Sequence, residues 1–260
     1  MEWHIPRSHP RYYSIIIRER LVKAFHEGIV VPQGLIAHGR GEAFDYILGE
    51  TSHEFALEAE RAAVALILLA KKPIISVNGN YASLASHEIV ELSLETNAII
   101  EVNLFYRTED RIAKIEDLLR KAGAKNILGV NCEKTLIPGL ESPRGIVCKD
   151  GIYSADVVLV AIEDGDRTQA LKRIKKKVIA IDLNPFSRTA QSADITIVDE
   201  AIRATRNMVK IARELKGLDR RLLEQIVNSY DNRRILMDAF KTIKARLEEA
   251  SSKGFILEAP

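Results

Sequence analysis

Residues 34–50, "GLIAHGRGEAFDYILGE", place two glycines around an arginine, directly after an apolar run and directly before a helical pattern. Glycines let backbone N–H groups approach phosphate oxygens, and a following helix offers the positive end of its dipole. Arg40 would add a charged donor, so the segment predicts an anion-binding turn. The alternative is that Gly39 and Gly41 only shape the entry to a helix. The dinucleotide pattern G-x-G-x-x-G fails at Phe44, and the sequence contains no G-x-x-x-x-G-K-[ST].

His38 lies beside this arginine and could donate a hydrogen bond to a phosphate or to a developing charge. The alternative is an ordinary packing or surface histidine. The sequence has no G-x-S-x-G, no H-E-x-x-H and no cysteine placed with a histidine in a nucleophile motif. Chemistry through an enzyme-bound nucleophile is therefore unsupported, whereas reactions that position two substrates and stabilise charge, such as adenylate formation, remain open.

Polar clusters follow four predicted strands: "NGN" (78–80), "NLFYR" (103–107), "EDGDR" (163–167) and "LNPFSR" (183–188). In an open parallel sheet such strand ends share one edge, where ligands bind. Loops are polar in every protein, but these clusters are rich in amide and guanidinium groups, which suit phosphates and carboxylates. They predict one pocket for a nucleotide or a phosphorylated metabolite. The groups concerned are Asn78, Asn80, Asn103, Asn184, Arg107, Arg167 and Arg188.

Carboxylates are present at the same strand ends, in Asp164, Asp166 and Asp182. They could accept hydrogen bonds from ribose hydroxyls or carry a magnesium ion, directly or through water. Asp166 could instead cap the helix "DRTQALKRI". The metal ligands stay unassigned.

The elements that must position these residues alternate between short Ile- and Val-rich runs and longer segments of helical period, which is typical of a parallel sheet. We expect strands at 74–77, 98–102, 127–130, 156–162, 178–182 and 195–198. A first helix should begin near Ser8 or Pro10 and end near Gly28, with Tyr13, Ile17, Leu21 and Phe25 on one face.

Helix-end signals predict two further helices. Thr108 should cap a helix that ends at Gly123, and Thr51 with Glu54 should form a capping box for an apolar helix over 53–70. From Ala201 only helices are expected, to about 216 and then from 219 to about 249. The predicted fold is therefore α/β: a Rossmann-like open parallel sheet of about six strands with helices on both faces, plus helical N-terminal and C-terminal segments. We expect a domain over 1–216 and a helical extension over 217–260.

The composition excludes several functions. With 38 Lys and Arg residues against 36 Asp and Glu residues, the charge calls for neither nucleic acid nor a membrane surface, and the longest apolar runs are too short to cross a bilayer. A cytoplasmic protein is expected. Cys132 and Cys148 are widely separated and are interpreted as incidental thiols rather than a disulfide.

Seven segments in order resemble the archaeal phosphopantothenate synthetases, the 4-phosphopantoate–beta-alanine ligases. They are "IPRSHPRYYS", "GLIAHGRGEAFDYILGE", "ISVNGN", "EVNLFYRTEDR", "IPGLESPRG", "ADVVLVAIEDGDRT" and "IDLNPFSRTAQSADITIVD". They cover residues 5 to about 215, whereas the helix after Asp219 carries less of the resemblance. The paired-histidine motif of bacterial pantothenate synthetases is absent.

The resemblance implies a Rossmann-like homodimer that joins 4-phosphopantoate to beta-alanine with ATP cleaved to AMP and pyrophosphate, in the presence of Mg²⁺, for coenzyme A synthesis. Arg40 and His38 would be catalytic. The residues that would bind ATP are Arg18, Arg40, Asp182, Leu183, Asn184, Arg188, Thr189 and Glu200. The phosphopantoate candidates are Asn78, Asn80, Asn103, Tyr106 and Arg107. A nicotinamide-dependent oxidoreductase and a non-catalytic nucleotide-binding regulatory protein are the alternatives.

Overall fold

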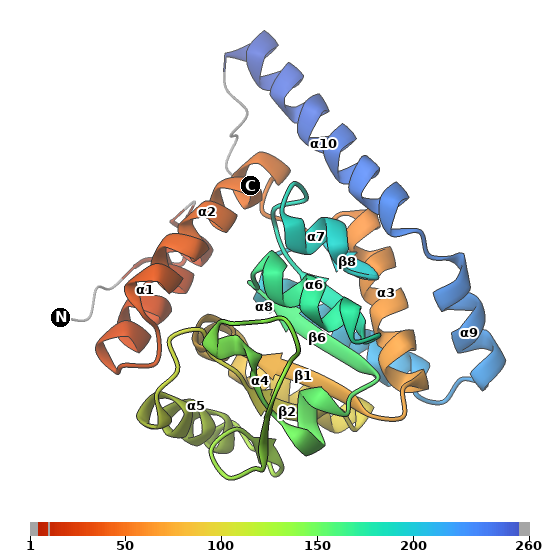
Figure 1. Ribbon diagram of the computed structural model, residues 1–260. Coiled ribbons are helices and arrows are strands. Elements are labelled where there is room, and N and C mark those ends of the chain that lie inside the picture. Colours follow the sequence, from red (N-terminus) through yellow and green to blue (C-terminus); the bar gives the residue numbers. More distant parts are fainter. Residues whose placement is uncertain (1–4, 10, 255–260) are drawn as a thin grey trace.

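Six parallel strands form one open sheet at the centre of the molecule (Figure 1). The computed structural model describes residues 5–9 and 11–254. The strands are β1 (Pro73–Val77), β2 (Ile99–Val102), β3 (Ile127–Leu128), β6 (Val157–Ala161), β7 (Lys177–Ile181) and β8 (Ile195–Ile197). Their spatial order is β3-β2-β1-β6-β7-β8. The chain thus builds outward from β1 to one edge and restarts on the other side of β1, which is the doubly wound Rossmann order and confirms the predicted fold class.

The strands are buried on both faces because alternate side chains enter two separate apolar cores. On β1, Ile75 and Val77 belong to the larger core, whereas Ile74 belongs to the smaller one. On β6, Leu159 and Val158 divide in the same way. This two-sided burial explains why the strands were predictable as unbroken Ile and Val runs.

Helices cover both faces of the sheet. They are α1 (Tyr12–His26), α2 (Pro32–Leu48), α3 (Glu54–Leu69), α4 (Gly79–Thr96), α5 (Glu109–Lys121), α6 (Gly165–Arg173), α7 (Arg188–Ser192), α8 (Ala201–Leu215), α9 (Arg220–Ser229) and α10 (Asn232–Lys253). Helices α3, α4, α5 and α8 enclose the larger core, and α6 contributes to the smaller one. Figure 1 shows α1 and α2 together on one side of the molecule, with α10 extending from α9 toward the end of α2. None of the helices that the structure describes is long and apolar enough to cross a membrane.

The predicted glycine turn is wrong, because Gly39 and Gly41 lie inside the continuous helix α2. The helix begins at Pro32, a residue favoured in the first helical position, and ends before Gly49, whose φ is 94°. These start and stop signals outweigh the cost of roughly 0.5–1 kcal/mol for each internal glycine. A third glycine, Gly34, is sterically required, since a Cβ there would lie 2.2 Å from Oδ1 of Asn80.

The helix ends confirm some of the predictions. Thr108 caps α5 by accepting a hydrogen bond from the N–H of Arg111, and Gly123 follows the helix with φ of 105°. The Thr51–Glu54 capping box is wrong: His53 occupies the cap position and makes no side-chain cap bond, and its ring bonds the carbonyl of Leu48 instead.

The last predicted helix is two helices, because Asp231 starts α10 by accepting from the N–H groups of Arg233 and Arg234. Leu223 of α9 and Ile235 of α10 are part of the larger core. The domain boundary after residue 216 stays a prediction, and residues 255–260 lie outside the described part. Likewise Pro10, one of the two expected starts of the first helix, lies outside it.

A small antiparallel hairpin was missed by the sequence analysis. It consists of β4 (Lys134–Leu136) and β5 (Ile146–Cys148) and lies between β3 and β6 in the chain. The hairpin brings Cys132 and Cys148 together in a disulfide with a Cα–Cα distance of 5.6 Å, so their interpretation as incidental thiols is wrong. Separation in sequence was a poor guide because hairpin pairing places Lys134 opposite Cys148.

Candidate active site

A cavity of about 460 Å³ opens at the carboxyl edge of the sheet, between the strand ends and helix α2. Its volume lies in the range typical of small-molecule sites. Nine of the sequence-predicted site residues line it: His38, Arg40, Asn78, Asn80, Tyr106, Asp182, Leu183, Asn184 and Glu200. Residues from α2 and from the ends of β1, β2, β7 and β8 therefore converge, as the strand-end pattern predicted.

Besides Asp166 and Arg167, five predicted residues lie outside the cavity lining, and their roles stay predictions. Asn103 is fully buried and donates its amide to the carbonyl oxygens of Arg144 and Ile146. Thr189 is buried and donates to the carbonyl of Glu163. Both side chains therefore hold the strand-end loops in place.

The other three are arginines. Arg18 pairs with Glu42, at 3.2 Å between Nε and Oε1. Arg107 donates to the carbonyl of Gly129. Arg188 is largely exposed and pairs with Asp166, at 2.9 Å.

Asn78 and Asn80 fix the centre of the cavity. Asn78 caps α4, its Oδ1 accepting from the N–H of Tyr81, and donates to the carbonyl of Ala161 at 2.8 Å. This bond joins the ends of β1 and β6, the two strands at which the chain reverses its direction of winding. Asn80 donates to the carbonyl of Gly34 at 2.7 Å and so ties α4 to α2.

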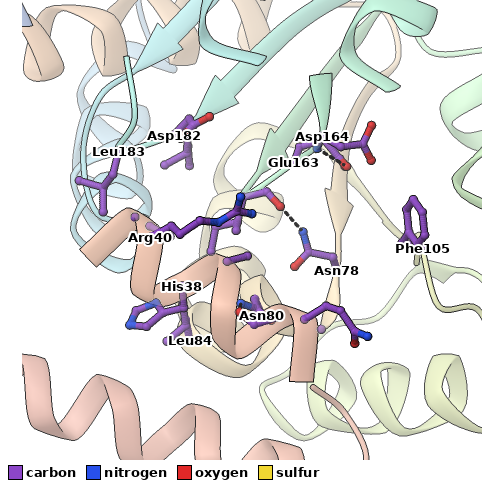
Figure 2. A pocket seen from close by; sticks show the side chains of 18 of the residues that line it. His38, Arg40, Asn78, Asn80, Leu84, Phe105, Glu163, Asp164, Asp182 and Leu183 are labelled. Carbon is purple, nitrogen blue, oxygen red and sulfur yellow. Dashed lines mark hydrogen bonds between the residues drawn. The ribbon is translucent and has the colours of Figure 1, made fainter. Parts of the chain in front are cut away.

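Arg40 extends from α2 toward the strand ends that carry Asn78 and Asp182 (Figure 2). Within the described residues its guanidinium is engaged in no hydrogen bond or ion pair, so its donors are available to a ligand. Burial raises the pKa of Asp182, while the positive charge of Arg40 acts in the opposite direction. Burial and the charge of Arg18 lower the pKa of His38, which favours a neutral imidazole at pH 7.

The loop after β7 is rigid because its own side chains bond its backbone. Asp182 accepts from the N–H of Asn184 and from the hydroxyl of Ser187. Asn184 accepts from the N–H of Phe186, and Ser187 caps α7. The loop thus presents fixed polar groups to the cavity.

Glu200 lines the cavity at the start of α8, where it accepts from the N–H groups of Ile202 and Arg203. Burial raises the pKa of Glu200 to about 7, even though these backbone hydrogen bonds lower it. Its carboxyl group therefore exchanges protons near neutral pH.

Three charged residues at the cavity were missed by the sequence analysis as site residues: Arg111, Arg144 and Glu163. Burial alone would raise the pKa of Glu163, but the guanidiniums of Arg144 and the fully buried Arg167 hold it below its usual value. Asp164 caps α6, the position that Asp166 was considered for. The segments "EVNLFYRTEDR", "IPGLESPRG" and "EDGDR" contain these residues, but their spacing in sequence gave no sign that they meet.

The site suits anions better than a metal ion bound by the protein alone. No group of three His, Cys, Asp or Glu side chains in the described residues could hold a metal. Positive groups for an anion are the N-terminus of α4, which opens onto the cavity, and three guanidiniums, which share the lining with five carboxylates. The fold and the site together define an α/β enzyme for small anionic substrates.

The chain belongs to the phosphopantothenate/pantothenate synthetase family, whose model matches residues 55–246. It is 52% identical over 252 residues to a 4-phosphopantoate–beta-alanine ligase of Thermococcus kodakarensis, covering 96% of each chain. A ligase of the same name from Methanosarcina mazei is 49% identical over 249 residues, 96% of this chain and 98% of the relative. The family resemblance seen in the sequence is thereby confirmed.

Proposed function

We propose that this chain is an ATP-dependent carbon–nitrogen ligase that condenses 4-phosphopantoate with beta-alanine to 4′-phosphopantothenate, releasing AMP and pyrophosphate. The observation that carries the proposal is the identity of about half of all residues, over nearly the whole chain, with relatives of that name. The anion-binding cavity at the carboxyl edge of the sheet supports the same assignment, because ATP and 4-phosphopantoate are both anionic.

In this proposal ATP occupies the β7–β8 side of the cavity. Asp182 would accept hydrogen bonds from the adenosine, and Asn184 would both accept and donate them. Leu183 would lie beside the adenosine, and Glu200 would add a contact. Arg18, Arg188 and Thr189 lie outside the cavity lining and would reach the nucleotide only after side-chain movement. 4-Phosphopantoate would occupy the β1–β2 side. Its proposed contacts are Asn78, Asn80 and Tyr106. Arg107 would reach it only after side-chain movement, and Asn103 would act through the backbone of residue 144.

The reaction would proceed in two displacements. A carboxylate oxygen of 4-phosphopantoate attacks the α-phosphorus of ATP, and the bond from that phosphorus to the bridging oxygen breaks, so pyrophosphate leaves. The neutral amine of beta-alanine then attacks the carbonyl carbon of the acyl adenylate, and AMP leaves as the amide forms and the nitrogen loses a proton. No protein nucleophile takes part.

Arg40 would stabilise the negative charge that develops on the α-phosphate, since its guanidinium reaches the cavity unpaired. His38, with its pKa lowered, would donate a hydrogen bond from a neutral ring. Its Nε2 is buried without a hydrogen-bond partner, which suits a contact completed by substrate.

Mg²⁺ would enter with the phosphates of ATP, whose charge it neutralises. Asp164 fits as a ligand, because it lines the cavity and its buried Oδ2 makes no hydrogen bond, with only Nε of Arg144 near it at 3.4 Å. One or two carboxylates with phosphate oxygens and water are the usual surroundings of Mg²⁺, so the lack of a three-residue cluster is compatible with it.

Both alternatives are less well supported. A nicotinamide-dependent oxidoreductase would need a glycine-rich phosphate turn, but residues 39–44 are helical. A regulatory protein without turnover is at odds with membership of a synthetase family.

The direct test incubates the protein with ATP, Mg²⁺, 4-phosphopantoate and beta-alanine and measures AMP and pyrophosphate. AMP and pyrophosphate should form in equal amounts. The amide product should form only when 4-phosphopantoate and beta-alanine are both present. ADP and phosphate in place of AMP would exclude the adenylate route, and no nucleotide cleavage would overturn the function. With ¹⁸O in the phosphopantoate carboxylate, one labelled oxygen should appear in AMP.

A homodimer is also proposed. Large apolar side chains are exposed on neighbouring elements, among them Tyr13 and Val22 of α1, Ile36 of α2, and Met237 and Leu247 of α10. Light scattering after size exclusion should give twice the mass of one chain, and a monomer at micromolar concentration would contradict this.

A further inference from the structure

Two guanidinium groups line the β2 end of the cavity, and neither was a candidate from the sequence. Arg111 comes from the first turn of α5, and Arg144 precedes β5 in the hairpin. Nε of Arg111 is buried and has no hydrogen-bond partner, whereas the buried Nε of Arg144 makes no hydrogen bond but lies 3.4 Å from Oδ2 of Asp164. Arg144 is the more enclosed, with its side chain only 10% exposed. An unpaired, buried donor on Arg111, a residue that lines the cavity, indicates a missing acceptor.

Arg111 has no acidic partner among the described residues. Its guanidinium donates to two backbone carbonyls, those of Tyr106 and Ile29, the latter at 2.8 Å. A Cβ on Gly79 would lie 3.1 Å from its Nη2, so the group lies against the N-terminus of the 18-residue helix α4. Burial and the nearby charge of Arg144 lower the pKa of Arg111. The N-terminus of α4 and the guanidinium of Arg111 repel one another, and a bound anion would remove that repulsion.

The ion pairs of Arg144 do not supply that anion. Arg144 contacts Glu163 at 2.6 Å and Asp164 at 3.4 Å, and Arg167 contacts Glu163 as well. Two carboxylates thus balance two guanidiniums, and this cluster is neutral. The positive charge of Arg111 is not balanced by a carboxylate of the described residues. This indicates that Arg111 binds an anionic ligand.

The shape of the substrate places its phosphate at this end. In 4-phosphopantoate the carboxylate and the phosphate are at opposite ends of the molecule. If the carboxylate meets ATP near Arg40, the phosphate extends away from the nucleotide side. Figure 2 shows Leu183 and Phe105 on opposite sides of the pocket, with Arg40 between them. Phe105 lies on the loop before Arg111, at the end where the phosphate is expected.

We propose that Arg111, beside the neutral cluster that contains Arg144, binds the phosphate of the pantoate substrate and makes the enzyme select the phosphorylated over the unphosphorylated acid. The inference rests on the proposed ligase function. The family description names both a phosphorylated and an unphosphorylated product, so a residue that decides between them is to be expected. Asn103 is then a positioning residue, because its amide holds the backbone of Arg144.

The test compares 4-phosphopantoate with pantoate as substrate, each with saturating ATP and beta-alanine, in the wild type, Arg111→Met and Arg111→Lys. Methionine keeps the apolar stem and removes the charge, while lysine keeps the charge and removes the fork. Arg120→Ala is the matched control, since it removes a charge from the exposed far end of the same helix. Melting temperatures and the KM for ATP report on folding.

Arg111→Met should raise the KM for 4-phosphopantoate by roughly 10- to 100-fold, the range for one lost hydrogen bond to a charged group. Its kcat/KM for pantoate and its KM for ATP should stay within about twofold of wild type, Arg111→Lys should fall between, and Arg120→Ala should match wild type. If Arg111→Met does not fold, the Arg111→Lys variant is used for the test. The same quantity is compared, the ratio of kcat/KM for 4-phosphopantoate to kcat/KM for pantoate.

An unchanged ratio of kcat/KM for the two substrates, or an equal loss on both, would overturn the inference and leave the ligase function standing. A wild-type protein that cleaves no ATP with either acid would overturn both.

Discussion

Arg203 of α8 holds Asp45 of α2 through two N–H donors, with Nη1 3.1 Å from Oδ2 and Nη2 2.5 Å from Oδ1. Both side chains are largely buried, and Arg203 also pairs with Asp199 at the end of β8. This contact fastens α2 to the carboxyl edge of the sheet. The position of Arg40 over the cavity therefore depends on it.

Replacing Asp45 with alanine should lower the free energy of unfolding by about 3 kcal/mol, because it leaves a buried guanidinium partly uncompensated. The KM for ATP should rise as α2 loosens. Urea unfolding measures the first effect. The control is Arg206→Ala, which removes a half-exposed ion pair with Glu88 from α8, the helix of Arg203. It should lower the free energy of unfolding by less than about 1 kcal/mol. Equal costs for the two variants would contradict this account of α2.

Arg40→Ala should reduce kcat by roughly 100-fold or more, the typical effect of losing one charged contact to a transition state. Stability should change little, since Arg40 is exposed and makes no contact that the fold needs. Steady-state AMP release and a melting curve measure the two effects. Turnover like that of the wild type would remove Arg40 from the mechanism.

Glu60 should make stability depend on pH. It is fully buried in α3, its Oε2 lacks a hydrogen-bond partner, and burial followed by the charge of Asp199 raises its pKa to about 9. A carboxyl group with a raised folded pKa binds its proton more tightly in the folded state. Its contribution is complete below about pH 4.5 and is lost as pH rises toward 9.

The melting temperature of the wild type should therefore fall between pH 5 and pH 9, by the equivalent of a few kcal/mol. Glu60→Gln, which cannot ionise, should show a flatter profile and be the more stable protein at pH 8.5. Parallel profiles for the two proteins would show that Glu60 is not the group responsible.

Reduction of the Cys132–Cys148 disulfide should destabilise the hairpin by up to about 3 kcal/mol, the entropy of closing a loop of this size. Because the hairpin carries Arg144, the KM for 4-phosphopantoate should rise more than the KM for ATP. Calorimetry with and without reductant, and the same assays on Cys132→Ala, measure both effects. A reductant effect that persists in Cys132→Ala would have another origin.

The sheet was predictable because two-sided burial demands continuous apolar strands. The run "DVVLVAI" is typical of a strand buried on both faces. The polar clusters that follow such strands must lie together at the carboxyl edge of the sheet. Helix α2 was not predictable in the same way. The pair Gly39–Gly41 looks like a phosphate turn locally, and only the packing of α2 against α4, with Asn80 against Gly34, shows why the helix continues.

The β2 end of the cavity could not be predicted because its residues meet through contacts distant in the chain. Asn103 looks like a ligand-binding residue, but its amide donates hydrogen bonds to the backbone carbonyls of residues 144 and 146. Arg111 looks like a surface residue of an amphipathic helix, whereas its side chain reaches back to the carbonyl of Ile29. Asp182 was found because its position follows directly from the end of its strand, and Arg40 was found although the turn predicted for it is a helix.

The central claim is that one cavity at the carboxyl edge of the sheet holds both anionic substrates together. A crystal structure with 4-phosphopantoate and a non-hydrolysable ATP analogue tests it most directly. The account predicts the adenosine beside Asp182, the α-phosphate near Arg40, and the phosphopantoate phosphate against Arg111. Either ligand bound outside the cavity, or the two bound with the carboxylate remote from the α-phosphate, would contradict it.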